Sequence, residues 1–134
     1  MEPLSEFEKL VVEAVEGLPP DLLAHMDNVD VMVQGEPTLE QLRSVGVLSP
    51  GMLLGLYSGV PLTHRQRSYG MVLPDKIILF QTSIEAICST EETLVQKVRE
   101  VVAHEVAHHF GIGDKWLQAL EASRNHVQEN KARS

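Results

Sequence analysis

The chain has little of several features that define large classes of protein. A single cysteine among 134 residues excludes an intrachain disulfide and a multi-cysteine metal cluster, and is compatible with a reducing compartment. Only 11 residues are Lys or Arg, against 19 Asp or Glu, and no long basic run occurs, which argues against a nucleic-acid-binding surface. No apolar run approaches the roughly 18 residues of a spanning helix, and the N-terminus lacks the regions of a signal peptide. We therefore expect a cytoplasmic protein with neither a membrane nor a nucleic-acid partner.

The composition predicts one globular domain. A hydrophobic content of 43% in 134 residues is enough for a real core but leaves no room for a second domain. We expect this domain to span residues 1–134, with a frayed polar tail at 128–134 and no internal repeat. The oligomeric state is left open by the sequence.

Hydrophobic periodicity predicts an α+β fold. Helical spacing of apolar residues, together with a capping-box signature at Ser89 and Glu92, predicts a long helix over about 90–110. Alternating or short apolar runs bounded by Gly, Pro and Asp predict strands at 29–34, 53–57 and 77–80. Further helices are predicted at 4–16, 21–26, 38–45, 81–88 and 114–127. The expected architecture is a small sheet packed on the long helix, with N-terminal and C-terminal helices beside it.

Residues 104–114 form the string H-E-x-x-H-x-x-G-x-x-D, in which most positions have an assignable chemical role. His104 and His108 are four residues apart on the long helix and so project from one face, where a single zinc ion can take both imidazoles. Glu105 lies roughly 60 to 100° around the helix. It can therefore reach a water molecule on the metal without competing as a ligand, which is the position of a general base.

The end of the motif predicts a third zinc ligand. Gly111 can take a positive φ, end the helix and turn the chain back, so that Asp114 comes to the metal. Two imidazoles and one carboxylate would leave the fourth position open for water, as in a catalytic site. Asp114 is also a plausible N-cap of the last helix. The alternatives for the third ligand are Glu121, Glu129, His109 and His126.

A helical wheel places Glu105 and His109 inside the apolar stripe of the long helix, whereas Arg99 and its polar neighbours face away. An apolar setting should raise the pKa of the Glu105 carboxyl, while a nearby zinc ion would lower it. His109 points about 100° away from His108. We therefore expect His109 to be a core residue, or one that supports a ligand, rather than a ligand itself.

The motif, together with residues 54–61 (LGLYSGVP) and 74–80 (PDKIILF), resembles the small bacterial zincin-like metallopeptidases over about residues 5–120. The resemblance implies a minimal zincin-like fold, in which a small mixed β-sheet lies over an active-site helix without the extra subdomain of larger metalloproteases. It also implies that His104 and His108 bind zinc, that Glu105 is the general base, and that Asp114 occupies the third-ligand position. One zinc ion per chain is expected.

The expected function is zinc-dependent hydrolysis of peptide bonds in a peptide or protein substrate, with a zinc-activated water and Glu105 as base. Candidates for stabilising the oxyanion are Tyr57, His64, Arg65 and Tyr69. If the strand at 77–80 lies at the sheet edge, it could bind an extended substrate by strand addition. The alternative is a metal-binding or protein-interaction module that keeps the fold without catalysis. A metal-dependent ribonuclease is disfavoured by the acidic charge and by Asp114 in place of a third histidine.

Overall fold

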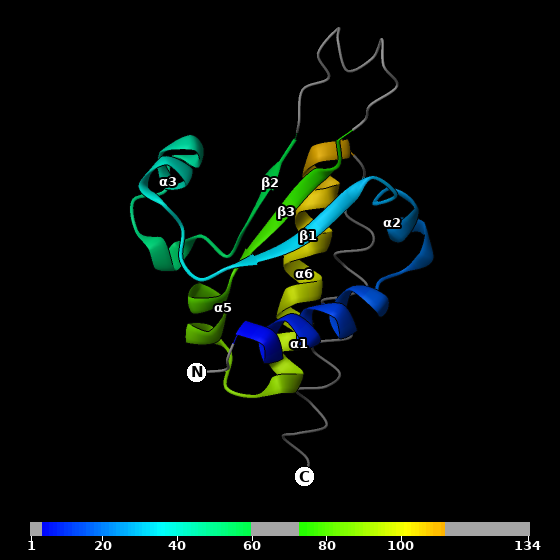
Figure 1. Ribbon diagram of the computed structural model, residues 1–134, viewed down its shortest axis with the longest axis horizontal. Helices are drawn as coiled ribbons and strands as arrows, with labels where there is room; N and C mark the ends of the chain where they lie inside the picture. Colours follow the sequence, from blue (N-terminus) through cyan, green and yellow to red (C-terminus); the bar gives the residue numbers. More distant parts are fainter. Residues whose placement is uncertain (1–3, 60–72, 112–134) are drawn as a thin grey trace, which may run out of the picture.

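The computed structural model describes residues 4–59 and 73–111, which form a three-stranded sheet with the two longest helices, α1 and α6, on one side of it (Figure 1). The elements follow the sequence in the order α1 (Leu4–Glu16), α2 (Pro20–Ala24), β1 (Val29–Gln34), α3 (Leu39–Val45), η1 (Pro50–Met52), β2 (Gly55–Ser58), β3 (Asp75–Phe80), α5 (Gln81–Ile87) and α6 (Glu91–Phe110). The α+β class is therefore confirmed. The helix expected at 114–127 lies outside the described residues.

The sheet is mixed and has the order β1-β3-β2. Strand β3 pairs in parallel with β1 and antiparallel with β2, so that Ile77 lies between Val31 and Tyr57. This central position suits a strand in which Ile77, Leu79 and Phe80 are fully buried, because a strand covered on both faces carries a nearly continuous apolar run. The expectation that residues 77–80 could add a substrate strand at the sheet edge is therefore wrong.

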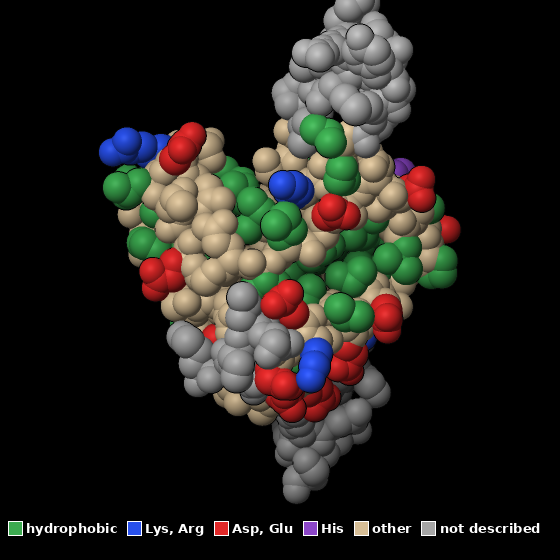
Figure 2. Space-filling model, in the orientation of Figure 1, with side chains coloured by type: hydrophobic (Ala, Val, Ile, Leu, Met, Phe, Trp, Pro, Cys, Tyr) green, Lys and Arg blue, Asp and Glu red, His purple; other side chains and the backbone are tan. Residues whose placement is uncertain are grey.

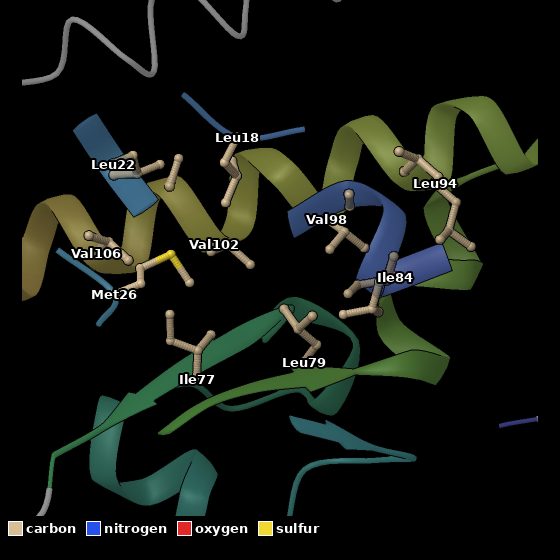
Figure 3. Packing of buried hydrophobic residues seen from close by; sticks show 14 of the residues in the cluster. Leu18, Leu22, Met26, Ile77, Leu79, Ile84, Leu94, Val98, Val102 and Val106 are labelled. Atoms are coloured by element: carbon tan, nitrogen blue, oxygen red, sulfur yellow. The ribbon is translucent and has the colours of Figure 1, made fainter. Parts of the chain in front are cut away.

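The main core lies between the sheet and α6. Ile77 and Leu79 point from β3 toward Val98, Val102 and Val106 of α6, and all five side chains have no exposed surface (Figure 3). Alternate residues of β3 face the other way, where Phe80 packs with Leu42 of α3 and Leu53 in a second, smaller cluster. The core thus fixes α6 along most of its length against one face of the sheet.

Both ends of α6 are set by local signals. Thr90 is the N-cap, and its side chain accepts a hydrogen bond of 3.1 Å from the Thr93 backbone N–H in a reciprocal capping box. The box expected from Ser89 and Glu92 is therefore wrong by one residue, because the overlapping threonine pair supplies the same hydrogen bonds. Gly111 ends the helix with a φ of +64°, as expected from its place in the motif.

The polar side of α6 is less exposed than the helical wheel suggests. Arg99 reaches across to α1, where its Nε donates to the carbonyl oxygen of Ala14 at 3.0 Å and Nη2 donates to that of Glu13 at 3.4 Å. Lys97 and Glu100 form a largely buried ion pair at 2.9 Å. The side of α6 that faces away from the apolar stripe is therefore partly covered, and at Arg99 the covering element is α1.

The surface matches the acidic composition. On the face seen in Figure 2, Lys and Arg side chains are few and scattered, while Asp and Glu side chains gather at the end of the molecule near α1. In residues 4–59 and 73–111, none of the helices has both the length and the apolar character needed to cross a lipid bilayer.

Candidate metal centre

His104 and His108 lie side by side on α6. Both side chains are exposed, and their ring centroids are 4.3 Å apart with an angle of 52° between the ring planes. They lie one turn apart on the side of the helix away from the fully buried Val102 and Val106, so neither imidazole is committed to core packing. The rings are close enough for one metal ion to contact a nitrogen of each.

Glu105 lies between the two histidines in sequence but is turned toward the protein interior. Its side chain is half-buried, next to the buried Val102 and Val106 on the same helix. Burial raises the pKa of the Glu105 carboxyl above its usual range, because a carboxylate loses hydration there, and the neighbouring His108 opposes this shift. The direction is the one expected from the apolar stripe. A carboxyl in this setting is a stronger proton acceptor than an exposed one.

The third predicted ligand, Asp114, lies outside the described residues, as do the alternatives Glu121, His126 and Glu129. Among the residues that the structure does describe, no three His, Cys, Asp or Glu side chains come together as a metal-binding group. Among the described residues, the candidate metal ligands are therefore the two imidazoles, and Glu105 is close to them in sequence. Two imidazoles on an exposed helix face suit zinc, which readily takes nitrogen ligands and leaves room there for a further ligand and for water.

His109 does not join the histidine pair. Its ring stacks on that of Tyr57 with a centroid distance of 3.8 Å and an angle of 13°, and its side chain is 39% exposed. The expectation of a core position is therefore wrong, because the last turn of α6 extends beyond the buried part of the helix. Phe110, which follows, is also exposed and packs edge-on against Tyr57 and tilted against His25.

Tyr57 is the only oxyanion candidate among the described residues, and its hydroxyl is already engaged. It donates a hydrogen bond of 2.6 Å to Asp75 Oδ2, at the start of β3. Burial, this hydrogen bond and the charge of Asp75 all raise the pKa of the Tyr57 hydroxyl. His64, Arg65 and Tyr69 lie outside the described part of the chain.

Asp75 was expected only as a residue at a strand boundary. The Asp75 carboxylate also lies 3.7 Å from His109 Nε2, so it contacts both members of the ring stack. The antiparallel register places Tyr57 opposite Ile77, which makes Asp75 a diagonal neighbour within reach of a long aromatic side chain. The pairing of β2 with β3 is the feature that would have identified Asp75 as a partner of Tyr57. The sequence alone does not specify this pairing.

The small mixed sheet over a helix that carries a paired-histidine motif defines a zincin-like protein. The model of the zincin-like metallopeptidase family matches residues 26–124, which is most of the chain and includes the whole motif from His104 to Asp114. The chain therefore belongs to this family. A comparison with curated proteins gave no match.

Proposed function

We propose that this protein is a zinc-dependent metallopeptidase that hydrolyses peptide bonds in a peptide or protein substrate. The observation that carries the proposal is the pair of exposed imidazoles, His104 and His108, with ring centroids 4.3 Å apart on the helix that also bears the half-buried Glu105. Membership of the zincin-like metallopeptidase family supports the same chemistry. We place the activity in the cytoplasm, since the single cysteine suits a reducing compartment.

In this proposal His104 and His108 hold one zinc ion per chain, and Asp114 is the third ligand. When bound, zinc would act as a Lewis acid on the peptide carbonyl and lower the pKa of a water molecule toward about 7. The support for Asp114 is its place in the motif, after the helix end at Gly111, where the chain leaves α6 with a positive φ.

Glu105 is the proposed general acid and base. It would take the proton from the attacking water and later deliver it to the departing amine. Its position on the inner side of the helix keeps it apart from the two imidazoles, and burial raises the pKa of its carboxyl, which favours proton uptake. The carboxyl therefore has a setting that suits proton transfer better than metal binding.

Strand β2 is the proposed binding edge for an extended substrate. Among the described strands β2 pairs only with β3, so it forms an edge of the sheet, and it packs against α6. The Phe80 N–H donates to the Leu54 carbonyl, so these two residues form a hydrogen-bonded pair. Because hydrogen-bonded and non-hydrogen-bonded pairs alternate along antiparallel strands, the backbone N–H and C=O groups of Gly55 and Tyr57 point away from β3. A substrate strand could pair with these groups near the end of α6.

The decisive experiment measures bound zinc and peptide cleavage on the same purified samples. The Glu105→Gln variant should keep one zinc per chain and lose cleavage, because the amide cannot accept the proton, whereas His104→Ala should lose both. Glu8→Gln is the matched control, since it makes the same change on an exposed residue of α1 and should behave like the wild type. Cleavage that survives Glu105→Gln with zinc bound would contradict the assignment of the base.

Two further outcomes distinguish the alternatives. A wild-type protein that binds zinc through His104 and His108 but cleaves nothing in a broad peptide library would be a non-catalytic metal-binding module. Asp114→Ala with unchanged zinc affinity would contradict the third ligand, and the same substitution would then be made at Glu121, His126 and Glu129 in turn.

A further inference from the structure

Three elements that are far apart in the sequence meet at the C-terminal end of α6. Tyr57 comes from the end of β2, Asp75 from the first position of β3, and His109 from the last turn of the helix. In Figure 1 this end of α6 lies beside the points where β2 ends and β3 begins. These three residues form a contact cluster that is separate from the paired imidazoles of His104 and His108.

The contacts within the cluster are short and directional. The Tyr57 hydroxyl donates to the Asp75 carboxylate at 2.6 Å, and a hydrogen bond to a charged acceptor at this distance is among the stronger kinds. The Asp75 side chain is only 24% exposed, which limits competition from water. With its hydroxyl anchored in this way, the Tyr57 ring presents its face to His109 at a centroid distance of 3.8 Å.

The chain that leaves β2 passes close to the same cluster. A β-carbon at Gly59 would lie 3.6 Å from His109 Cε1 and 3.7 Å from Asp75 Oδ1, which are ordinary van der Waals distances. The backbone at Gly59 is therefore a near neighbour of both side chains. The last turn of α6 is thus contacted by Tyr57 of β2 and Asp75 of β3, and the backbone at Gly59 lies close by.

This turn needs such contacts because the core reaches only its first residue, the buried Ala107. Val106 is fully buried, whereas His108, His109 and Phe110 are exposed, and the last turn of a helix has unpaired carbonyl groups and tends to fray. The backbone N–H of Gly111 donates a hydrogen bond to the carbonyl oxygen of Ala107, which pairs one of these carbonyl groups. His108 lies within this turn, directly before His109.

We infer that Asp75, Tyr57 and His109 are positioning residues for the zinc site. Asp75 orients the Tyr57 ring, the ring holds His109, and His109 fixes the turn of α6 from which His108 projects toward the metal. The inference rests on the proposed zinc site at His104 and His108. It assigns to the cluster no contact with zinc or substrate.

The test compares zinc binding by Tyr57→Phe, Asp75→Ala, Asp75→Asn, His109→Phe and a matched control, Asp30→Ala. Asp30 is an exposed aspartate on β1 of the same sheet, so its removal changes the net charge as Asp75→Ala does without touching the cluster. Three quantities are measured for each protein: the zinc affinity of the metal-free form by competition with a chelator, the visible absorption spectrum of the cobalt-substituted form, and the melting temperature of the metal-free form.

We expect Tyr57→Phe and Asp75→Ala to weaken zinc binding by about tenfold, the lower end of the effect seen for residues that orient metal ligands. The cobalt spectrum should change with them, because it reports the geometry of the ligands. Asp75→Asn keeps an oxygen that can accept from Tyr57 and should recover most of the affinity. His109→Phe keeps an aromatic ring against Tyr57 and should bind zinc with at most a similar loss.

Several results would overturn the inference. If Tyr57→Phe and Asp75→Ala lower the melting temperature but leave the zinc affinity and the cobalt spectrum unchanged, the cluster only stabilises the fold. If Asp30→Ala weakens zinc binding as much as Asp75→Ala does, the effect is one of net charge. Complete loss of zinc in His109→Phe would make His109 a ligand. A wild-type protein without zinc affinity, or with affinity unchanged by His104→Ala, would instead refute the proposed function on which the inference rests.

Discussion

Gly55 of β2 approaches Val101 of α6 so closely that a β-carbon at position 55 would lie 2.5 Å from Val101 Cγ1. Carbon atoms in van der Waals contact are about 3.5 to 4.0 Å apart, so no side chain fits at this position without movement. Gly55 is buried, and the edge strand and the helix therefore pack backbone against side chain. This contact holds β2 and the helix of the histidine pair at a fixed separation.

Gly55→Ala should destabilise the protein by about 1 to 3 kcal/mol, the usual cost of overfilling a packed site. The measurement is urea-induced unfolding. Gly35→Ala is the matched control, because nothing lies within 4 Å of a β-carbon there, and it should change stability by no more than about 0.5 kcal/mol. In a Val101→Ala background the cost of Gly55→Ala should fall, since the clashing methyl group is gone. An equal cost in both backgrounds would contradict this explanation.

The Arg99 side chain caps the C-terminal end of α1, although more than 80 residues separate the two in sequence. Its guanidinium donates to the carbonyl groups of Ala14 and Glu13, and it fills the space beside Gly17, where a β-carbon would collide with it. A cation at a helix C-terminus also interacts favourably with the helix dipole.

Arg99→Ala should therefore lower stability by about 1 to 2 kcal/mol, because α1 loses two hydrogen bonds and a favourable charge at its end. Arg99→Lys keeps the charge but not the forked geometry and should recover only part of the loss. Lys9→Ala is the control: its ion pair with Glu6 is exposed and should contribute less than about 1 kcal/mol. Equal unfolding midpoints for Arg99→Ala and Lys9→Ala would contradict the assigned role of Arg99.

The parts of the fold that could be predicted are those specified by local sequence. Apolar spacing predicts α1 and α6, and the alternating valines predict β1 with the bounds that the structure has. Gly111 was correctly expected to end the helix, because a position with positive φ favours glycine. The start of α6 was misplaced by one residue because Ser89 and Thr90 offer competing capping signals.

The parts that could not be predicted depend on contacts between distant segments. The central position of β3 follows from strand pairing, which no local pattern in residues 75–80 specifies. A helical wheel shows the direction of a side chain but not how far the core extends along the helix. It therefore placed His109 in the core, although α6 has already passed the buried layer at that residue. Asp75 likewise became part of the site only once β2 and β3 were brought into register.

Cys88 should react slowly with alkylating reagents. It packs at the margin of the main core, and burial raises the pKa of its thiol, with Glu100 adding to the shift and Lys97 opposing it. Because the thiolate is the reactive form, alkylation by iodoacetamide at mildly alkaline pH should be several-fold slower in the folded protein than in urea. A matched control moves the thiol to the exposed neighbouring position, as Ser89→Cys in a Cys88→Ala background. Equal rates at the two positions in the folded protein would show that the Cys88 thiol is not protected.

Glu105 should make the metal-free protein less stable at neutral pH than at mildly acidic pH. Its pKa is raised in the folded state, so the folded protein binds the proton more tightly than the unfolded chain does. The stability that Glu105 gains from this tighter proton binding is therefore fully present below the usual pKa of a glutamate. It is lost as the pH rises through the raised pKa of the folded state. Glu105→Gln removes the charge and should stabilise the metal-free protein at neutral pH by less than about 1 kcal/mol, since a half-buried carboxylate keeps part of its hydration. Urea unfolding across this pH range measures both effects, with the exposed Glu8→Gln as control.

A gain in stability that accompanies the loss of cleavage would show that Glu105 is kept at a cost to the fold, whereas a loss of stability in Glu105→Gln would contradict the desolvation argument.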